Sequence, residues 1–391
     1  MISLAALCIG VATLLFVTLL YYRRKCENDL LPPGPPGIVF ADGELWAEHR
    51  RFAITTLRNF GMGKSSLQEL VLGEARELVN AFKAFEGKPV APSAVILPSV
   101  CNVLCGISYG RRFSHQDARF IQLTKLTEEN LYLAAKCQPL DFFPYLRHIP
   151  FTNYKTMIQK WTNNQDQIGD FLQALIVEHK RNFRPSEDEP TDYVDAFLKQ
   201  QFVEKNKPDS TFTGAYIGIA SALSSLNFFA CLAERQLLRS INPFVGAGTQ
   251  ATSTTLCWAI FFLLDNPDVM TRVQKEIDGV LGERLFPLLE DKERLPYCQA
   301  TITEVLRLGN MVPIPGRSTV DVAEINGFIL PKGTKIAPLV IAVHEDPTLF
   351  PEPMAFKPER FLDQHGQFVN KVDWLLAFGS GTLLMALNWA G

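Results

Sequence analysis

The chain has 391 residues, of which 47% are hydrophobic and 11% aromatic, and its formal net charge is −3. This length and apolar content suffice for one large core or two domains, so we do not expect a disordered chain. The near-neutral charge, without a long run of Lys or Arg, argues against a nucleic-acid partner. The eight cysteines form no CxxC pair, which is typical of reduced residues in a cytosolic protein.

The first segment, residues 1–22, carries no charged side chain. About 20 residues at 1.5 Å each span a hydrocarbon layer roughly 30 Å thick, so the segment predicts a transmembrane signal anchor. Three basic residues follow at 23–25, which places the body of the chain in the cytosol. A removed signal peptide is the alternative, although its basic residues would precede the apolar run.

Residues 23–37 form a basic and proline-rich hinge that contains LLPPGPPG. Proline fixes φ and prevents a continuing helix, so we expect a stiff spacer. The body, residues 38–391, is predicted to be mainly α with a small β region.

Two helices and a set of strands are predicted within the body. Residues 244–264 are apolar nearly all round, which indicates a buried central helix or a membrane span, and the Thr, Ser and Gln residues within favour the buried helix. Asn266 as N-cap, Pro267 at the first position and Gly282 after the end predict an amphipathic helix. Turn signals at Asn326-Gly327 and Pro331-Lys332-Gly333 separate short strands within residues 322–340.

Two pairs of side chains lie at helical spacing. Trp46 and Arg50, in WAEHRRF, share one helical face and could donate to a carboxylate, although a surface helix is the ordinary interpretation. Glu304 and Arg307 lie at i, i+3, a spacing that is common on solvated helices.

Two further motifs could serve a cofactor. In AGTQATSTT, Ala247 and Gly248 would let a flat ligand or dioxygen approach the backbone, and a hydroxyl there could pass on protons. Small residues would equally serve helix–helix packing. FKPERFLD and LLAFGSG place an arginine in a proline-broken loop before a glycine loop.

In this order, the motifs resemble the microsomal cytochrome P450 family, most like its family 2 members. The motifs are an apolar anchor, PPGPPG, WxxxR, the AGT helix, ExxR, PERF and FGSG, with LPYCQATITEVLRLGNMVPIPGRSTVD between them. The resemblance covers most of the chain and implies the P450 fold, preceded by one N-terminal transmembrane helix. An unrelated helical membrane-anchored structural protein would give no reason for these motifs to occur in this order.

The resemblance implies a haem cofactor and assigns side chains to it. A buried charge triad would hold the cofactor loop, and it consists of Glu304, Arg307 and Arg360. The residues that would bind haem are Trp46, Arg50, Arg317, Phe378 and Gly381. The helix that passes over the haem would carry the catalytic residues, which are Ala247, Gly248, Thr249, Gln250 and Thr252.

The proximal ligand of the family is replaced in this chain. The pattern FxxGxRxCxG, aligned on Phe378 and Gly381, puts Leu383 at the arginine, Met385 at the cysteine and Leu387 at the last glycine. A thiolate favours O–O cleavage, whereas a neutral thioether raises the reduction potential instead. We therefore predict a variant form that lacks the cysteine segment and has no protein ligand for the metal, unless Cys257 or Cys298 takes that place.

Other positions also depart from the family. A block between the hinge and WxxxR is missing, and we expect the domain to be incomplete at both ends. Residues 214–232 form an uncharged insertion, either a second hydrophobic segment or a translated intron. Gln250 and Ala251 stand where the family has an acid and a threonine, and Thr252 points about 100° away from Ala251.

The resemblance implies a haem-thiolate monooxygenase in the endoplasmic reticulum membrane with its body facing the cytosol. It would use O2 and electrons from NADPH–cytochrome P450 reductase to oxidise a lipophilic substrate such as a fatty acid or a xenobiotic. The alternative is a catalytically inactive variant or splice product that cannot bind thiolate-ligated haem.

Overall fold

The computed structural model describes residues 37–38, 41, 43–60, 65–149, 151–207, 210–213, 226–311, 317–369 and 374–377. The predicted anchor at residues 1–22 and the hinge up to residue 36 lie outside the described residues. Within the described ranges, no helix is both long enough and apolar enough to cross a membrane.

The described chain is mainly helical, as predicted. Its α-helices are α2 (Gly43–Asn59), α3 (Ser65–Lys83), α4 (Ser93–Tyr109), α5 (Ala118–Cys137), α6 (Pro139–Phe142), α7 (Tyr154–Asn182), α8 (Tyr193–Val203), α9 (Leu226–Asp265), α10 (Pro267–Leu281), α11 (Pro296–Gly309) and α12 (Val340–His344). The 3-10 helices are η1 (Pro144–His148), η2 (Leu289–Arg294) and η3 (Pro358–Phe361).

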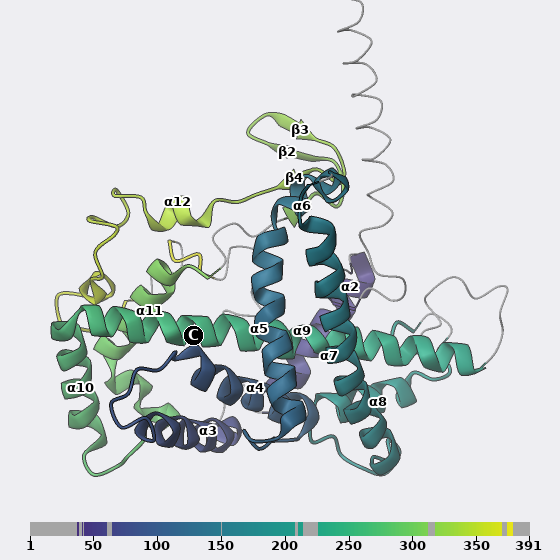
Figure 1. Ribbon diagram of the computed structural model, residues 1–391, viewed down its shortest axis with the longest axis horizontal. Coiled ribbons are helices and arrows are strands. Elements are labelled where there is room, and N and C mark those ends of the chain that lie inside the picture. Colours follow the sequence, from purple (N-terminus) through teal and green to yellow (C-terminus); the bar gives the residue numbers. More distant parts are fainter. Residues whose placement is uncertain are drawn as a thin grey trace, which may run out of the picture.

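Helix α9 runs across the body of the molecule (Figure 1), and α4, α5, α7, α10 and α11 pack against it. It has 40 residues, so it is roughly 60 Å long. Helix α4 packs along α9, α5 packs against α7, and α10 and α11 contact α9 near its C-terminal end. The larger core lies among α4, α5, α7, α8 and α9 and includes Cys105, Leu172, Phe197 and Val245.

Small residues let α4 and α9 approach closely. A Cβ atom on Gly248 would lie 2.8 Å from Cδ1 of Leu104, so a larger residue there would force the Leu104 side chain to move. Val245, Thr249 and Ser253 of α9 are also buried. At Gly248, the small-residue motif therefore serves helix packing rather than the approach of a ligand.

The predicted amphipathic helix is α10, but the role of Asn266 differs from the prediction. Pro267 opens the helix and Gly282 follows it with φ +57°. The Asn266 side chain makes no cap hydrogen bond to α10; its Nδ2 donates to the carbonyl of Phe262 at 2.8 Å. Because α9 ends at Asp265, an unpaired carbonyl of α9 is the nearer partner.

The small β region consists of two antiparallel pairs. Strands β2 (Ala323–Ile325) and β3 (Phe328–Leu330) form a hairpin, and β1 (Arg317–Ser318) pairs with β4 (Lys335–Ile336). Asn326 and Gly327 both have positive φ, as the predicted two-residue turn requires. The hairpin lies at one edge of the molecule in the view of Figure 1.

The uncharged insertion ends inside α9. Its residues 226–232 are the first residues of that helix, and residues 214–225 lie outside the described residues. The last part of the insertion is therefore continuous with the central helix.

Candidate functional site

A buried ion-pair cluster lies where α11 meets η3. Glu304 and Arg307 are 0% and 1% exposed, so they do not form a solvated surface pair. Arg307 donates from Nε to Glu304 Oε2 at 2.7 Å and from Nη2 to Oε1 at 2.8 Å. Arg360 of η3 donates from Nε to the same Oε1 at 3.3 Å. The structure thus brings together the three side chains that the resemblance groups as a triad.

Main-chain groups complete the hydrogen bonding of the triad. Arg307 Nη1 donates to the His344 carbonyl at 2.6 Å, and the Lys357 amide donates to Glu304 at 3.0 Å. Arg360 donates to two carbonyls of the preceding loop, those of Pro351 and Glu352. Burying charge costs free energy unless the charge is paired and hydrogen-bonded, and here these conditions are met. The loop before η3 is thereby fixed to α11.

A second polar cluster, which the sequence did not single out, lies beside the triad. Glu359 accepts from Arg272 of α10 at 2.8 Å and from the Tyr297 hydroxyl of α11 at 2.9 Å. The Arg272 guanidinium lies 4.0 Å from the Tyr297 ring centroid. Burial, and then the bond to Glu359, raises the pKa of Tyr297 to about 12. Each residue stands in an ordinary helical or loop pattern, so no sequence signal could have joined them.

The WxxxR pair lies on α2, as the spacing predicts. The Arg50 guanidinium carbon is 5.4 Å from the Trp46 ring centroid. Nε and Nη2 of Arg50 are buried and have no hydrogen-bond partner among the described residues. An open cavity of about 320 Å³ lies beside them, lined also by Ile54 and Thr55. The third expected donor, Arg317, pairs through its backbone with Ile336, and its side chain lies outside the described residues.

The candidate catalytic residues of α9 are divided between different faces of the helix. Ala247 and Thr252 are exposed, whereas Thr249 and Gln250 are buried. Thr249 lies about 200° around the helix from Ala247 and Thr252 about 140°. Gly248 packs against Leu104 of α4. The helix therefore does not present these five residues together to one ligand.

The glycine loop is described only at its entry. Phe378, Gly381 and Met385 lie outside the described residues. Just before them, the amide of Leu376 donates to Nε2 of His344 at 2.9 Å.

The two cysteines considered as replacement ligands are poorly suited to that role. Burial, and then a bond to Glu276, raises the pKa of Cys298. Burial also raises the pKa of Cys257. A thiol must lose its proton to ligate a metal, and a raised pKa opposes that loss.

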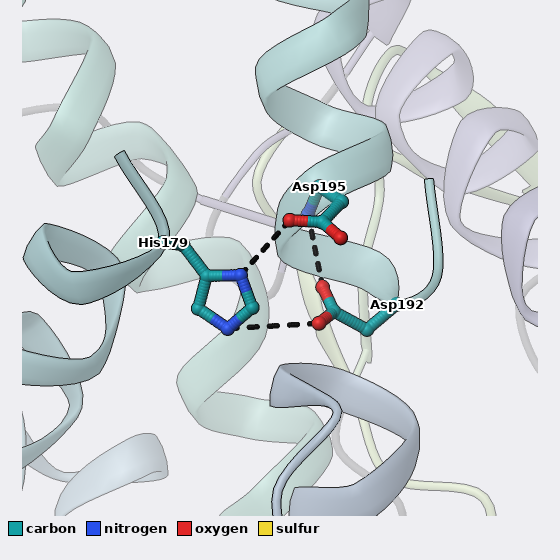
Figure 2. A group of neighbouring side chains, drawn as sticks. All are labelled: His179, Asp192 and Asp195. Carbon is teal, nitrogen blue, oxygen red and sulfur yellow. Dashed lines mark hydrogen bonds and ion pairs between the residues drawn. The ribbon is translucent and has the colours of Figure 1, made fainter. Parts of the chain in front are cut away.

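A separate cluster joins the ends of α4, α7 and α8 (Figure 2). His179 lies between two aspartates: Nδ1 is 2.9 Å from Asp195 Oδ1, and Nε2 is 3.5 Å from Asp192 Oδ2. Nε2 also lies 3.1 Å from the carbonyl of Tyr109. Among the described residues, the ligand atoms of these three side chains lie close enough together, within 4.8 Å of one another, to bind one metal ion. However, both ring nitrogens face acceptors, so the ring acts as a donor at each and has no lone pair for a metal.

Comparison with known proteins identifies the family. A model of the cytochrome P450 family matches residues 22–382. Cytochrome P450 2D28 of Mesocricetus auratus is 36% identical over 360 residues, which are 91% of this chain and 66% of that protein. Cytochrome P450 2J2 of Homo sapiens is 36% identical over 336 residues, 85% of this chain and 61% of that protein. Cytochrome P450 2J3 of Rattus norvegicus is 37% identical over 344 residues, 87% of this chain and 63% of that protein. The chain belongs to the cytochrome P450 family and is similar to its family 2 members.

The chain spans between 61% and 66% of the length of these three relatives. Membership in the family implies a haem cofactor. The N–H groups of Arg50 beside Trp46, which are buried and have no partner in the described part of the chain, fit the carboxylate groups of haem.

Proposed function

We propose that the protein is a P450-type haem monooxygenase that oxidises lipophilic small molecules. The observation that carries the proposal is the Arg50 guanidinium, whose Nε and Nη2 are buried beside Trp46 without a partner among the described residues. A buried donor without an acceptor costs free energy, and an anionic ligand would remove that cost. A surface helix would give no reason to bury these groups.

In this proposal each group of residues has a physical task. Arg50, with Trp46, holds the propionates of haem. The triad of Glu304, Arg307 and Arg360 fixes the loop before η3, so that the chain entering FGSG has a rigid support. When bound, haem would supply the activation of O2, which needs electrons from a reductase and protons from solvent and would yield an oxygenated substrate and water.

The proton supply differs from the family pattern. Gln250 has no titratable proton and is buried, and Thr249 is fully buried against neighbouring helices. Thr255 donates its hydroxyl to the Ala251 carbonyl at 2.9 Å, so that hydroxyl is already in use. Of the two threonines among the five candidate residues, Thr252 is the exposed one, and we assign proton transfer from solvent to its hydroxyl.

The remaining parts of the proposal rest on the sequence and the family. The apolar segment at residues 1–22 followed by basic residues supports anchoring in the endoplasmic reticulum membrane with the body in the cytosol. The apolar, aromatic-rich composition supports a lipophilic substrate such as a fatty acid or a xenobiotic. NADPH–cytochrome P450 reductase is the electron donor in this scheme.

A second function is favoured by the residue at the ligand position. Met385 occupies that position, and the family match ends at residue 382, before it is reached. A thioether lacks the charge with which a thiolate promotes O–O cleavage. In the second proposal this chain keeps the P450 scaffold but does not insert oxygen.

The test is the absorption spectrum of the full chain in detergent, supplemented with haem and reduced under carbon monoxide. A Soret band typical of thiolate ligation would support the monooxygenase and exclude the second function. A band typical of thioether or histidine ligation would support the second function. The matched variants are Met385→Cys, which should produce the thiolate band, and Met385→Ala, which should not. Failure of the wild type to bind haem would also support the second function and would contradict the monooxygenase.

A further inference from the structure

His344 links the buried triad to the entry of the glycine loop. It is the last residue of α12 and is 1% exposed. Its side chain contacts the backbone of Leu376, which lies two residues before Phe378, where FGSG begins. Its own carbonyl accepts the bond from Arg307 Nη1 at 2.6 Å. One buried residue thus touches both the triad and the chain that leads into the loop.

The contact with Leu376 defines the chemical state of the ring. A backbone amide can only donate, so Nε2 of His344, 2.9 Å from the Leu376 nitrogen, must accept and carries no proton. The neutral ring then holds its proton on Nδ1, which is buried without a partner among the described residues. Burial, and then the charge of Arg307, lowers the pKa of His344 to about 4, so the ring is neutral at physiological pH.

The two bonds of His344 have a mechanical consequence. Arg307 is held by two hydrogen bonds to Glu304, so the His344 carbonyl has a rigid partner. The ring of the same residue accepts the hydrogen bond from the Leu376 amide, so His344 links residues 374–377 to the buried triad. Without the ring, the entry to the loop would lose its hydrogen bond to the buried framework.

We propose that His344 is a positioning residue, whose neutral ring fixes the entry of the haem loop by accepting a hydrogen bond from the backbone amide of Leu376. Its importance for haem rests on the proposed function. The hydrogen bond itself does not, because it is made by two residues of the chain.

The experiment measures hydrogen exchange at the Leu376 amide in the full chain without haem. Gln places its amide oxygen near the position of Nε2 and can accept the bond, whereas the shorter side chain of Asn cannot reach and Leu has no acceptor. We expect His344→Leu and His344→Asn to speed exchange at Leu376 at least tenfold, and His344→Gln to stay within about threefold of the wild type. Equal rates in the wild type and His344→Leu, or equal acceleration in His344→Leu and His344→Gln, would overturn the proposal.

A second measurement needs no destabilising variant. In wild-type protein labelled with 15N-histidine, the His344 signals should report the Nδ1–H tautomer, with His344→Gln used to assign them. The Nε2–H tautomer would overturn the proposal, even if His344→Leu failed to fold.

A haem titration separates this inference from the proposed function. We expect about tenfold weaker haem binding in His344→Leu than in the wild type, with recovery in His344→Gln. Absence of haem binding in the wild type, with the Leu376 amide still protected, would overturn the haem function and leave the bond of His344 supported. Equal haem affinity in wild type and His344→Leu, with the amide deprotected, would overturn the positioning role.

Discussion

Arg307 is a charged side chain with almost no access to water. Each of its three nitrogens has an acceptor: Glu304 binds Nε and Nη2, and the His344 carbonyl binds Nη1. The cation also lies 5.0 Å from the Phe350 ring centroid. Because the protein replaces the whole hydration shell, the loss of one partner leaves a buried charge without compensation.

Glu304→Gln should lower the free energy of unfolding by roughly 3–5 kcal/mol, because the amide cannot neutralise Arg307. Denaturant unfolding followed by circular dichroism measures the change. The matched control is Glu187→Gln, which removes an exposed partner of Arg184 and should change stability by less than about 1 kcal/mol. Equal effects of the two variants would contradict the assignment of a buried, paired charge.

At the scale of secondary structure, the ends of α4, α7 and α8 are held by one polar cluster. Gly110 follows α4 in the left-handed conformation, and Asp192 caps α8 by accepting from the Asp195 amide at 2.9 Å. His179 of α7 contacts both aspartates and the last carbonyl of α4. Three helix ends therefore depend on the same few atoms.

Gly110→Ala should destabilise the protein by roughly 2–3 kcal/mol. Its φ of +57° strains any residue with a Cβ atom, and the new Cβ would lie 2.8 Å from Asp192 Oδ2. Gly87→Ala is the matched control, because φ is +81° there but no atom lies within 4 Å, and it should cost about 1 kcal/mol. Thermal and denaturant unfolding measure both. A Gly110→Ala cost no larger than that of Gly87→Ala would show that Asp192 does not need its position.

The same cluster predicts a pH dependence of stability. Burial opposes the charge of His179, but the bond to Asp195 and the charge of Asp192 outweigh it and raise the pKa of His179. Burial raises the pKa of Asp192 to about 6. Burial likewise opposes the charge of Asp195, but the bonds from His179 and Thr191 outweigh it and lower that pKa.

Because its pKa is raised in the folded state, His179 stabilises the fold when it is protonated. This contribution to stability is complete below the pKa of the unfolded chain, about 6.5, and is lost as pH rises through the pKa of the folded protein. We expect the difference in unfolding free energy between wild type and His179→Gln to shrink by roughly 1–2 kcal/mol from pH 5.5 to pH 8.5. A difference that grows with pH would mean that His179 is not the charged partner of Asp195.

At the scale of the whole molecule, the β2–β3 hairpin is poorly covered. Phe328 and Ile329 are 73% and 74% exposed. Successive residues of a strand point to opposite faces, so both faces of the hairpin present apolar surface within the described structure. Such surface favours association between molecules.

Phe328→Thr combined with Ile329→Thr should increase the monomeric fraction in size-exclusion chromatography with light scattering. The free energy of unfolding should change by less than about 1 kcal/mol, because neither side chain is buried. Val305→Thr, at a site 2% exposed, is the contrasting variant and should cost roughly 1–3 kcal/mol. A loss of stability in the double variant as large as that of Val305→Thr would show that the hairpin is covered.

The sequence by itself determined the class of fold, the helices at α2, α10 and α11, the turns of the small sheet and the family. These features depend on local spacing, on proline and glycine positions and on motif order, all of which the sequence states directly. Only the tertiary structure decided which polar residues are buried together. The Glu304–Arg307 spacing is equally compatible with an ion pair exposed on a helix surface. The partners of His179, His344 and Glu359 come from segments distant in the sequence. Burial depends on how helices pack against one another, and that packing turned Gly248 and Thr249 toward the core and left Ala247 and Thr252 exposed.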